Sequence, residues 1–251
     1  MKECGVERTE DIDVELLAFN VGLLVNEDQL SGAEARLLCN DRVGMIVVNR
    51  RARENGRKRF GVAHEIGHFV RHRNKYFVSR CTSESFLDWR ADSSLEGEAN
   101  AFAAELLMPD FLFDPRLVCG SPSFDVVENL ASEFKTTLTA TAIRFVELTS
   151  HACALFAVTD RKVKWFSVSK YFPYRVIGSG TSISKHCVAN DFFDGKAVPQ
   201  IAETVIGSAW IEDFEVGENC LLKEEARELR SYGIVLSFVS IEEDRNPTRE
   251  K

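Results

Sequence analysis

The stretch that decides the fold of this chain reads Arg59-Phe60-Gly61-Val62-Ala63-His64-Glu65-Ile66-Gly67-His68-Phe69-Val70-Arg71-His72. Its apolar residues recur at the spacing of one helix face, which predicts an α-helix. On a helix, His64 and His68 lie one turn apart on the same side, so their imidazoles can converge on one divalent cation. Glu65 lies about 100° further round the helix, where its carboxylate can accept a proton from a metal-polarised water. The pattern H-E-x-x-H therefore indicates a metal-dependent hydrolase.

The pattern alone leaves an alternative open. Only three of its five positions are fixed, so it arises by chance in some chains, and two histidines on a helix can be ordinary surface residues. A third ligand at a suitable place decides between the two interpretations.

Gly67 lies in the interior of the predicted helix. Because glycine costs a helix interior roughly 1 kcal/mol relative to alanine, we expect a close neighbour that leaves no room for a side chain.

A second helical pattern begins at Leu95 and is ended by Pro109. Its periodicity places Glu96 beside the buried stripe and Glu98 on the solvated side, which favours Glu96 as the third ligand. Asn100, one turn after Glu96, can hydrogen-bond a ligand histidine and fix its tautomer. Two histidines and one glutamate, with one position left to water, are typical of a catalytic rather than a structural zinc site.

Other residues near the motifs stay open as alternatives. The polar stretch between the two helices holds Tyr76, which could stabilise an oxyanion, as could His72. The same stretch holds carboxylates that would replace Glu96 as third ligand if the register differed: Glu84, Asp88 and Asp92.

Taken together, H-E-I-G-H at residues 64–68 and E-x-x-A-N-x-F-A-A-E-L-L-M-P at residues 96–109 resemble the ImmA/IrrE family of bacterial and phage metallopeptidases. The resemblance implies a zincin-like fold in which His64, His68 and Glu96 hold zinc, or manganese in the cell, and Glu65 is the catalytic base. His72 stands where such proteins often have a histidine. We interpret it as supporting the ligands, with substrate contact as the less favoured role.

Residues before the first motif predict a small sheet. An amphipathic helix is expected over Asp13–Leu24, followed by strands at Ala35–Cys39 and Met45–Val48. A strand beside an active-site helix can hold a peptide by adding it to the sheet, and Met45–Asn49 is the candidate. The alternative is a strand with both edges covered. The basic segment Arg50–Arg59 is interpreted first as a solvated loop, and second as a device that steers an acidic or DNA-associated substrate.

After the second motif, two further helices are expected at Asp125–Phe134 and Leu138–Leu148. Their arrangement resembles a helix-turn-helix, but acidic residues outnumber basic ones in the segment. Because a phosphate-binding element should be basic, we expect these helices to pack on the peptidase and consider direct DNA binding unfavoured.

The C-terminal part changes to strand patterns. A small α/β domain on an antiparallel sheet is expected, with strands at Cys153–Val158, Val163–Val168, Thr204–Ile211 and Gly233–Ile241 and helices at Lys185–Phe193 and Lys223–Ser231. The resemblance implies that this domain is GAF-like. The fold class is therefore α+β, with three predicted parts: a mainly helical metallopeptidase domain at 1–116, a helical helix-turn-helix-like segment at 117–150, and the GAF-like domain at 151–251.

The composition bears on the location of the protein, on the redox state of its cysteines and on nucleic-acid binding. No run of 18 apolar residues occurs and the start, Met1–Glu10, is polar, which predicts a cytoplasmic protein without a membrane span. The seven cysteines are scattered without a C-x-x-C pair and are expected to be reduced thiols. The net charge of −8 argues against nucleic-acid binding by the whole chain.

These observations predict an intracellular zinc metallo-endopeptidase. The resemblance implies that its substrate is a regulatory protein, a helix-turn-helix repressor or an antitoxin, whose cleavage switches on a response to stress or to mobile elements. The alternative is a metal-binding sensor or adaptor that regulates transcription by binding a repressor without cutting it. A third, weaker interpretation is a DNA-binding regulator that uses the helices within Asp125–Leu148.

Overall fold

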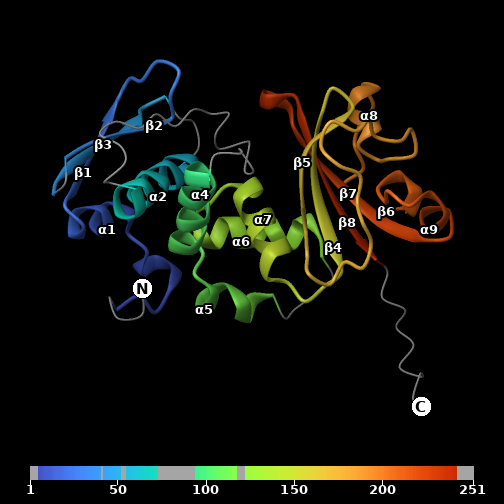
Figure 1. Cartoon of the computed structure of the whole chain (residues 1–251), viewed down its shortest axis with the longest axis horizontal. Helices are drawn as coiled ribbons and strands as arrows, with labels where there is room; N and C mark the ends of the chain where they lie inside the picture. Colours follow the sequence, from blue (N-terminus) through green and yellow to red (C-terminus); the bar gives the residue numbers. More distant parts are fainter. Residues whose placement is uncertain (1–4, 41, 52–54, 73–93, 118–121, 242–251) are drawn as a thin grey trace, which may run out of the picture. The chain divides into compact units, whose positions relative to one another are not determined.

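The computed structural model of the chain describes residues 5–40, 42–51, 55–72, 94–117 and 122–241. The chain divides into two compact units (Figure 1). Unit 1 comprises Met1–Cys119 and Val127–Phe145, and unit 2 comprises Gly120–Val126 and Val146–Lys251. The predicted three-part division at residues 116 and 150 remains a prediction. Both units mix helices and sheet, which confirms the α+β class.

The described part of unit 1 starts with a 3-10 turn and contains a three-stranded sheet. Its first elements are η2 (Thr9–Asp11), α1 (Val14–Asn20), β1 (Leu23–Asp28), β2 (Ala35–Cys39) and β3 (Gly44–Asn49). The strand order is β1-β3-β2, with β1 parallel and β2 antiparallel to β3. Both predicted strands are confirmed. The proposal that Met45–Asn49 receives a substrate strand is wrong, because β3 is the central strand and both of its edges are paired.

The helix expected over Asp13–Leu24 is shorter than the apolar pattern indicated. It starts where predicted, since the Asp13 carboxylate accepts hydrogen bonds from the backbone of the first turn. It ends at Asn20, and strand β1, which the helical apolar spacing does not predict, starts at Leu23. Gly22 makes the sharp change of direction with φ +91°, and a Cβ there would lie 2.8 Å from the carbonyl oxygen of Arg42. Glycine is needed at this point because it accepts a positive φ without steric cost.

Helices complete unit 1 and continue into unit 2. They are α2 (Asn55–His72), α4 (Ser94–Leu107), α5 (Asp110–Phe113), η3 (Asp114–Arg116), α6 (Phe124–Phe134) and α7 (Leu138–Leu148). The two helices that carry the motifs pack on each other at Gly67. A Cβ on Gly67 would lie 3.1 Å from Phe102 Cδ1 and 3.2 Å from Ala99 Cα. The close neighbour expected from the sequence is confirmed.

Helices α6 and α7 confirm the two helices predicted after the second motif. Arg144 of α7 is 8% exposed, donates from Nε to the carbonyl oxygen of Met108 over 3.1 Å, and pairs with Glu105 and Asp110. A basic side chain of this segment is thus used inside unit 1. That arrangement supports packing of the two helices within unit 1 rather than contact with phosphate.

The basic segment Arg50–Arg59 is only partly a loop. From Asn55 onward it forms the first turns of α2, and its side chains have partners in unit 1. Arg57 pairs with Glu34 over 3.1 Å, and Lys58 pairs with Glu27 over 2.8 Å. These contacts neutralise charge locally, so the structural interpretation of the segment is preferred over substrate steering.

Unit 2 is built on a five-stranded antiparallel sheet in the order β5-β4-β8-β7-β6. Its elements are β4 (Cys153–Thr159), β5 (Lys162–Val168), α8 (Asn190–Phe193), β6 (Glu203–Ile206), η4 (Gly207–Ala209), α9 (Phe214–Glu218), β7 (Leu221–Leu229), η5 (Arg230–Tyr232) and β8 (Ile234–Ile241). The predicted antiparallel sheet is confirmed. The strand expected over Thr204–Ile211 ends earlier, at Ile206, and the helix expected over Lys185–Phe193 is reduced to α8.

The helix expected over Lys223–Ser231 is wrong, since this segment forms β7 and the turn after it. Its residues favour helices in isolation, but β7 is paired with β6 on one side and β8 on the other. Glu224 is completely buried in the strand. Its carboxylate accepts from the backbone of Val188 and Ala189 at 3.0 Å each, from Trp210 Nε1 at 2.8 Å and from Ser237 Oγ at 2.8 Å.

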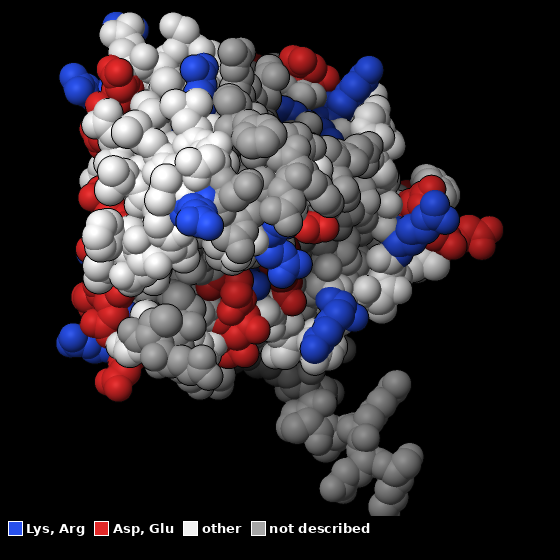
Figure 2. Space-filling model, turned by 60° about the vertical axis from the view of Figure 1, so that its left-hand side comes forward, with Lys and Arg blue, Asp and Glu red and all other residues white. Residues whose placement is uncertain are grey.

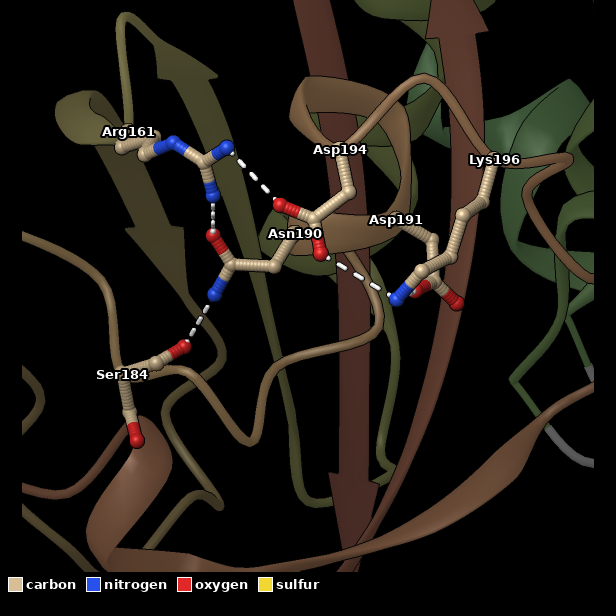
Figure 3. A network of polar contacts seen from close by, with 6 residues as sticks. All are labelled: Arg161, Ser184, Asn190, Asp191, Asp194 and Lys196. Atoms are coloured by element: carbon tan, nitrogen blue, oxygen red, sulfur yellow. Dashed lines mark hydrogen bonds and ion pairs between the residues drawn. The ribbon is translucent and has the colours of Figure 1, made fainter.

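Figure 3 shows how α8 is attached to the turn between β4 and β5. Asp160 and Arg161 both have positive φ, 49° and 59°, as in a two-residue hairpin turn that follows the twist of the strands. From this turn, Arg161 donates to Asn190 Oδ1 and to Asp194 Oδ1, each over 2.8 Å. Lys196 lies 3.1 Å from the other oxygen of Asp194. The network fixes the start and the end of α8.

Within the described ranges, no helix has both the length and the apolar composition needed to cross a membrane.

Candidate metal centre

The candidate metal centre lies where α2 packs against α4. His64 and His68 of α2 are 0% and 4% exposed, and their Nε2 atoms are 2.9 Å apart. Glu96 in the first turn of α4 places one carboxylate oxygen 3.3 Å from His64 Nε2 and the other 3.4 Å from His68 Nε2. One ligand atom from each residue lies within 4.8 Å of the others. Within the described ranges, this is the one group of three or more His, Cys, Asp or Glu that meets in this way.

These residues fit a divalent metal. Imidazole nitrogen and carboxylate oxygen are zinc ligands, and tetrahedral ligands about 2.0–2.1 Å from zinc lie roughly 3.3 Å from one another. The observed separations of 2.9–3.4 Å match that spacing.

Asn100 fixes the orientation of His64. Its Oδ1 lies 2.8 Å from His64 Nδ1, and both residues are buried. An amide oxygen only accepts, so the imidazole proton sits on Nδ1 and the Nε2 lone pair faces Glu96 and His68. This is the tautomer that can bind a metal through Nε2.

His72 performs the same task for His68, with help from Glu98. His72 Nδ1 lies 3.2 Å from His68 Nδ1, and His72 Nε2 lies 2.9 Å from Glu98 Oε2. If Nε2 of His68 is to bind a metal, Nδ1 of His68 donates to His72, whose own proton must then point to Glu98. Glu98 is half-exposed, yet it ends this chain of contacts. The sequence predicts Glu98 on the solvated side, because periodicity along α4 does not reveal which residue of α2 lies opposite.

Glu65 follows His64 on α2 and is fully buried. Its position on the helix next to the two histidines is the one that the motif requires of a base. The remaining sequence candidates, Tyr76, Glu84, Asp88 and Asp92, lie outside the described residues. The roles assigned to all these residues therefore remain proposals, which the geometry of the six described sequence candidates supports.

Comparison with known proteins found a family model that matches the chain and solved structures with a similar fold. The family model of the IrrE N-terminal-like domain, Peptidase_M78, matches residues 19–146 and so includes α2 and α4. A solved structure, a transcriptional regulator of Mycobacterium tuberculosis, has a similar fold with a TM-score of 0.56 at 14% sequence identity, over 96% of this chain and 84% of that one. Curated protein sequences gave no match.

Proposed function

Because the chain belongs to the IrrE N-terminal-like family of metallopeptidases, Peptidase_M78, we propose that it is a zinc-dependent endopeptidase of the H-E-x-x-H type. The proposed ligands are His64, His68 and Glu96. The observation that carries the proposal is the meeting of their three ligand atoms within 4.8 Å, from two helices that pack directly on each other. Zinc is the proposed metal, with manganese as the alternative in the cell.

When bound, the metal would polarise the scissile carbonyl and the attacking water. The chain's own residues supply the remaining chemistry. Glu65 accepts the proton of the water on its carboxylate and passes it to the nitrogen of the leaving amine. Asn100 keeps the Nε2 lone pair of His64 directed into the site, and His72 with Glu98 does so for His68.

The proposed substrate is a protein that controls transcription, a repressor or antitoxin, whose cleavage would switch on a stress or mobile-element response. Support comes from the family and from the motif resemblance. Residues 151–251 are proposed to form a GAF-like sensory domain, and residues 1–116 to form a zincin-like domain. The second candidate function, a metal-binding adaptor that holds a regulator without cutting it, shares the same metal site and differs only in the need for Glu65.

Identification of new protein N-termini by mass spectrometry tests the proposal. Zinc-loaded wild-type protein and Glu65→Gln, which removes the base but retains the three ligands, would be incubated with a cell extract of the source organism. Cleavage products that form with wild type and fall by at least about a hundredfold with Glu65→Gln are expected. Equal product formation by both proteins would remove Glu65 from the mechanism. Zinc-loaded wild type that binds a regulator and leaves it whole would favour the adaptor.

A further inference from the structure

Large apolar side chains are exposed together on one surface of unit 1. Six of them are between 38% and 65% exposed. They come from α1, the three strands and the turn between β2 and β3, and we call them the apolar face: Leu16, Phe19, Leu24, Leu38, Val43 and Met45.

The strand register makes this face continuous. Leu24 of β1 and Leu38 of β2 are both paired with Met45 of β3, so the three side chains form a row across the whole sheet. The adjacent residues Ile46 and Leu37 are 0% and 3% exposed, because they point to the opposite side of the sheet. That opposite side is covered by α2, whereas the row containing Met45 has no covering element among the described residues.

A hollow of 710 Å³ lies in the apolar face, lined by Phe19, Leu24, Leu38, Val43, Met45 and neighbouring uncharged residues. Of the described residues that line it, none is Lys, Arg, Asp or Glu. Figure 2 turns the side of the molecule with α1 and β1 toward the viewer, and charged side chains are sparse over much of that side. The face thus combines apolar character with a lack of charge at its centre.

We propose that the apolar face binds the same face of a second copy of this chain, in a homodimer with two-fold symmetry. The six side chains expose apolar surface on the order of 500 Å², near the upper end of the range for the largest patch on a monomer. Each partner contributes roughly 800 Å² to a standard interface. The apolar face would supply most of that area, and the polar residues around it would supply the rest.

The charge distribution of the face is compatible with a second copy. A two-fold interface brings each surface against its own duplicate, so a charged residue at the centre would meet its like. The part of the hollow's lining that the structure describes carries no charge, so two such surfaces can meet there without repulsion. The face also lies on the side of the sheet away from α2, which carries His64 and His68. A molecule bound there does not approach the metal centre, which argues against the face as the binding site of the scissile segment.

Sedimentation equilibrium of the full chain over a wide concentration range tests the proposal, independently of any peptidase activity. Wild type is expected at about twice the chain mass of 28.3 kDa. The double variant Leu24→Glu/Leu38→Glu is expected at the mass of one chain, with a dissociation constant raised at least about a hundredfold by like charges that face each other. Ile201→Glu is the control, because Ile201 is 74% exposed in unit 2 and its substitution should leave the dimer intact.

A complementary variant shows whether the loss of mass reflects the interface or misfolding. Leu24→Lys/Leu38→Lys alone should be monomeric, and mixing it with the double Glu variant should restore the dimer mass. Hydrogen exchange of wild type should slow at residues 19–24 and 38–45 as concentration rises. A wild type that stays at one chain mass, alone or bound to another protein, would overturn the proposal. So would a dimer that persists in the Glu variant, or protection confined to other residues.

Discussion

His68 and His72 face each other through their Nδ1 atoms, 3.2 Å apart, and the far nitrogen of His72 lies 2.9 Å from Glu98. Only one arrangement of protons satisfies both contacts with neutral imidazoles and leaves Nε2 of His68 available to a metal. His68 is thus held by a histidine and a carboxylate in series, whereas His64 is held by the single amide of Asn100. Both ligand histidines have a defined tautomer before metal arrives.

Removal of this support should weaken metal binding without removing a ligand. Glu98→Ala is expected to lower zinc affinity by about 10–100-fold, measured by competition with a chelator, since partners of ligand histidines usually have effects of this size. Glu98→Gln should be affected less, because its amide oxygen still accepts from His72 Nε2. If Glu98→Ala binds zinc as wild type does, the contact with His72 has no role in the metal site.

The packing of α2 on α4 gives a stability prediction with an internal control. Gly67→Ala should lower the free energy of unfolding by about 1–3 kcal/mol, because its Cβ would meet Ala99 and Phe102 at 3.1–3.2 Å. Gly97→Ala on α4 meets nothing within 4 Å and should raise it, by up to about 1 kcal/mol. Urea unfolding of both variants measures the difference. A Gly67→Ala protein more stable than wild type would show that the two helices can separate at little cost.

Glu224 is expected to be essential for the stability of unit 2. Its two carboxylate oxygens accept from four donors, three of which are N–H groups that cannot reverse their role. Glu224→Gln places an NH2 group against at least one of these donors, so a loss of about 1–3 kcal/mol is expected in urea unfolding. Glu203→Gln, its exposed neighbour on β6, is the control and should change little. An unchanged midpoint for Glu224→Gln would contradict the assigned contacts.

The strand β7 also shows what sequence reasoning could and could not predict. Helices α2 and α4 were predictable, because long apolar periodicity agrees with local preference there, and the same periodicity selected Glu96. In β7 the two disagree: Lys, Glu, Ala, Leu and Arg prefer helix locally, and pairing with β6 and β8 overrides them. A fully buried glutamate has no signature in the sequence, since its donors come from distant segments.

Two other errors have related causes. The sequence predicts one helix through Leu24, because Leu24 fits the helical spacing. In the structure, the chain reverses at Gly22 with a positive φ, and strand β1 follows. The role of Glu98 depends on which residues of α2 and α4 lie opposite each other. The close approach of Gly67 to Ala99 sets this alignment of the two helices, and the pattern of either segment alone does not predict it.

Burial raises the pKa of the Cys153 thiol to about 12 from 9.0. At neutral pH its thiolate fraction is therefore very small, and Cys153 should resist alkylation by iodoacetamide in the native protein. Half-buried Cys39 is the comparison and should react faster, as followed by peptide mass spectrometry. Because the folded state favours the neutral thiol, the stability it contributes is complete below pH 9.0 and declines as pH rises toward about 12. Labelling of Cys153 at the rate of Cys39 would contradict its burial.

The central claim, that His64, His68 and Glu96 form a catalytic metal site, is tested most directly by the zinc content of purified full-length protein. Elemental analysis after zinc loading and dialysis would compare wild type with Glu96→Ala, which loses a ligand, and Glu65→Gln, which keeps all three. One zinc per chain is expected in wild type and in Glu65→Gln, and much less in Glu96→Ala. Wild type that retains no zinc, or Glu96→Ala that retains as much as wild type, would contradict it.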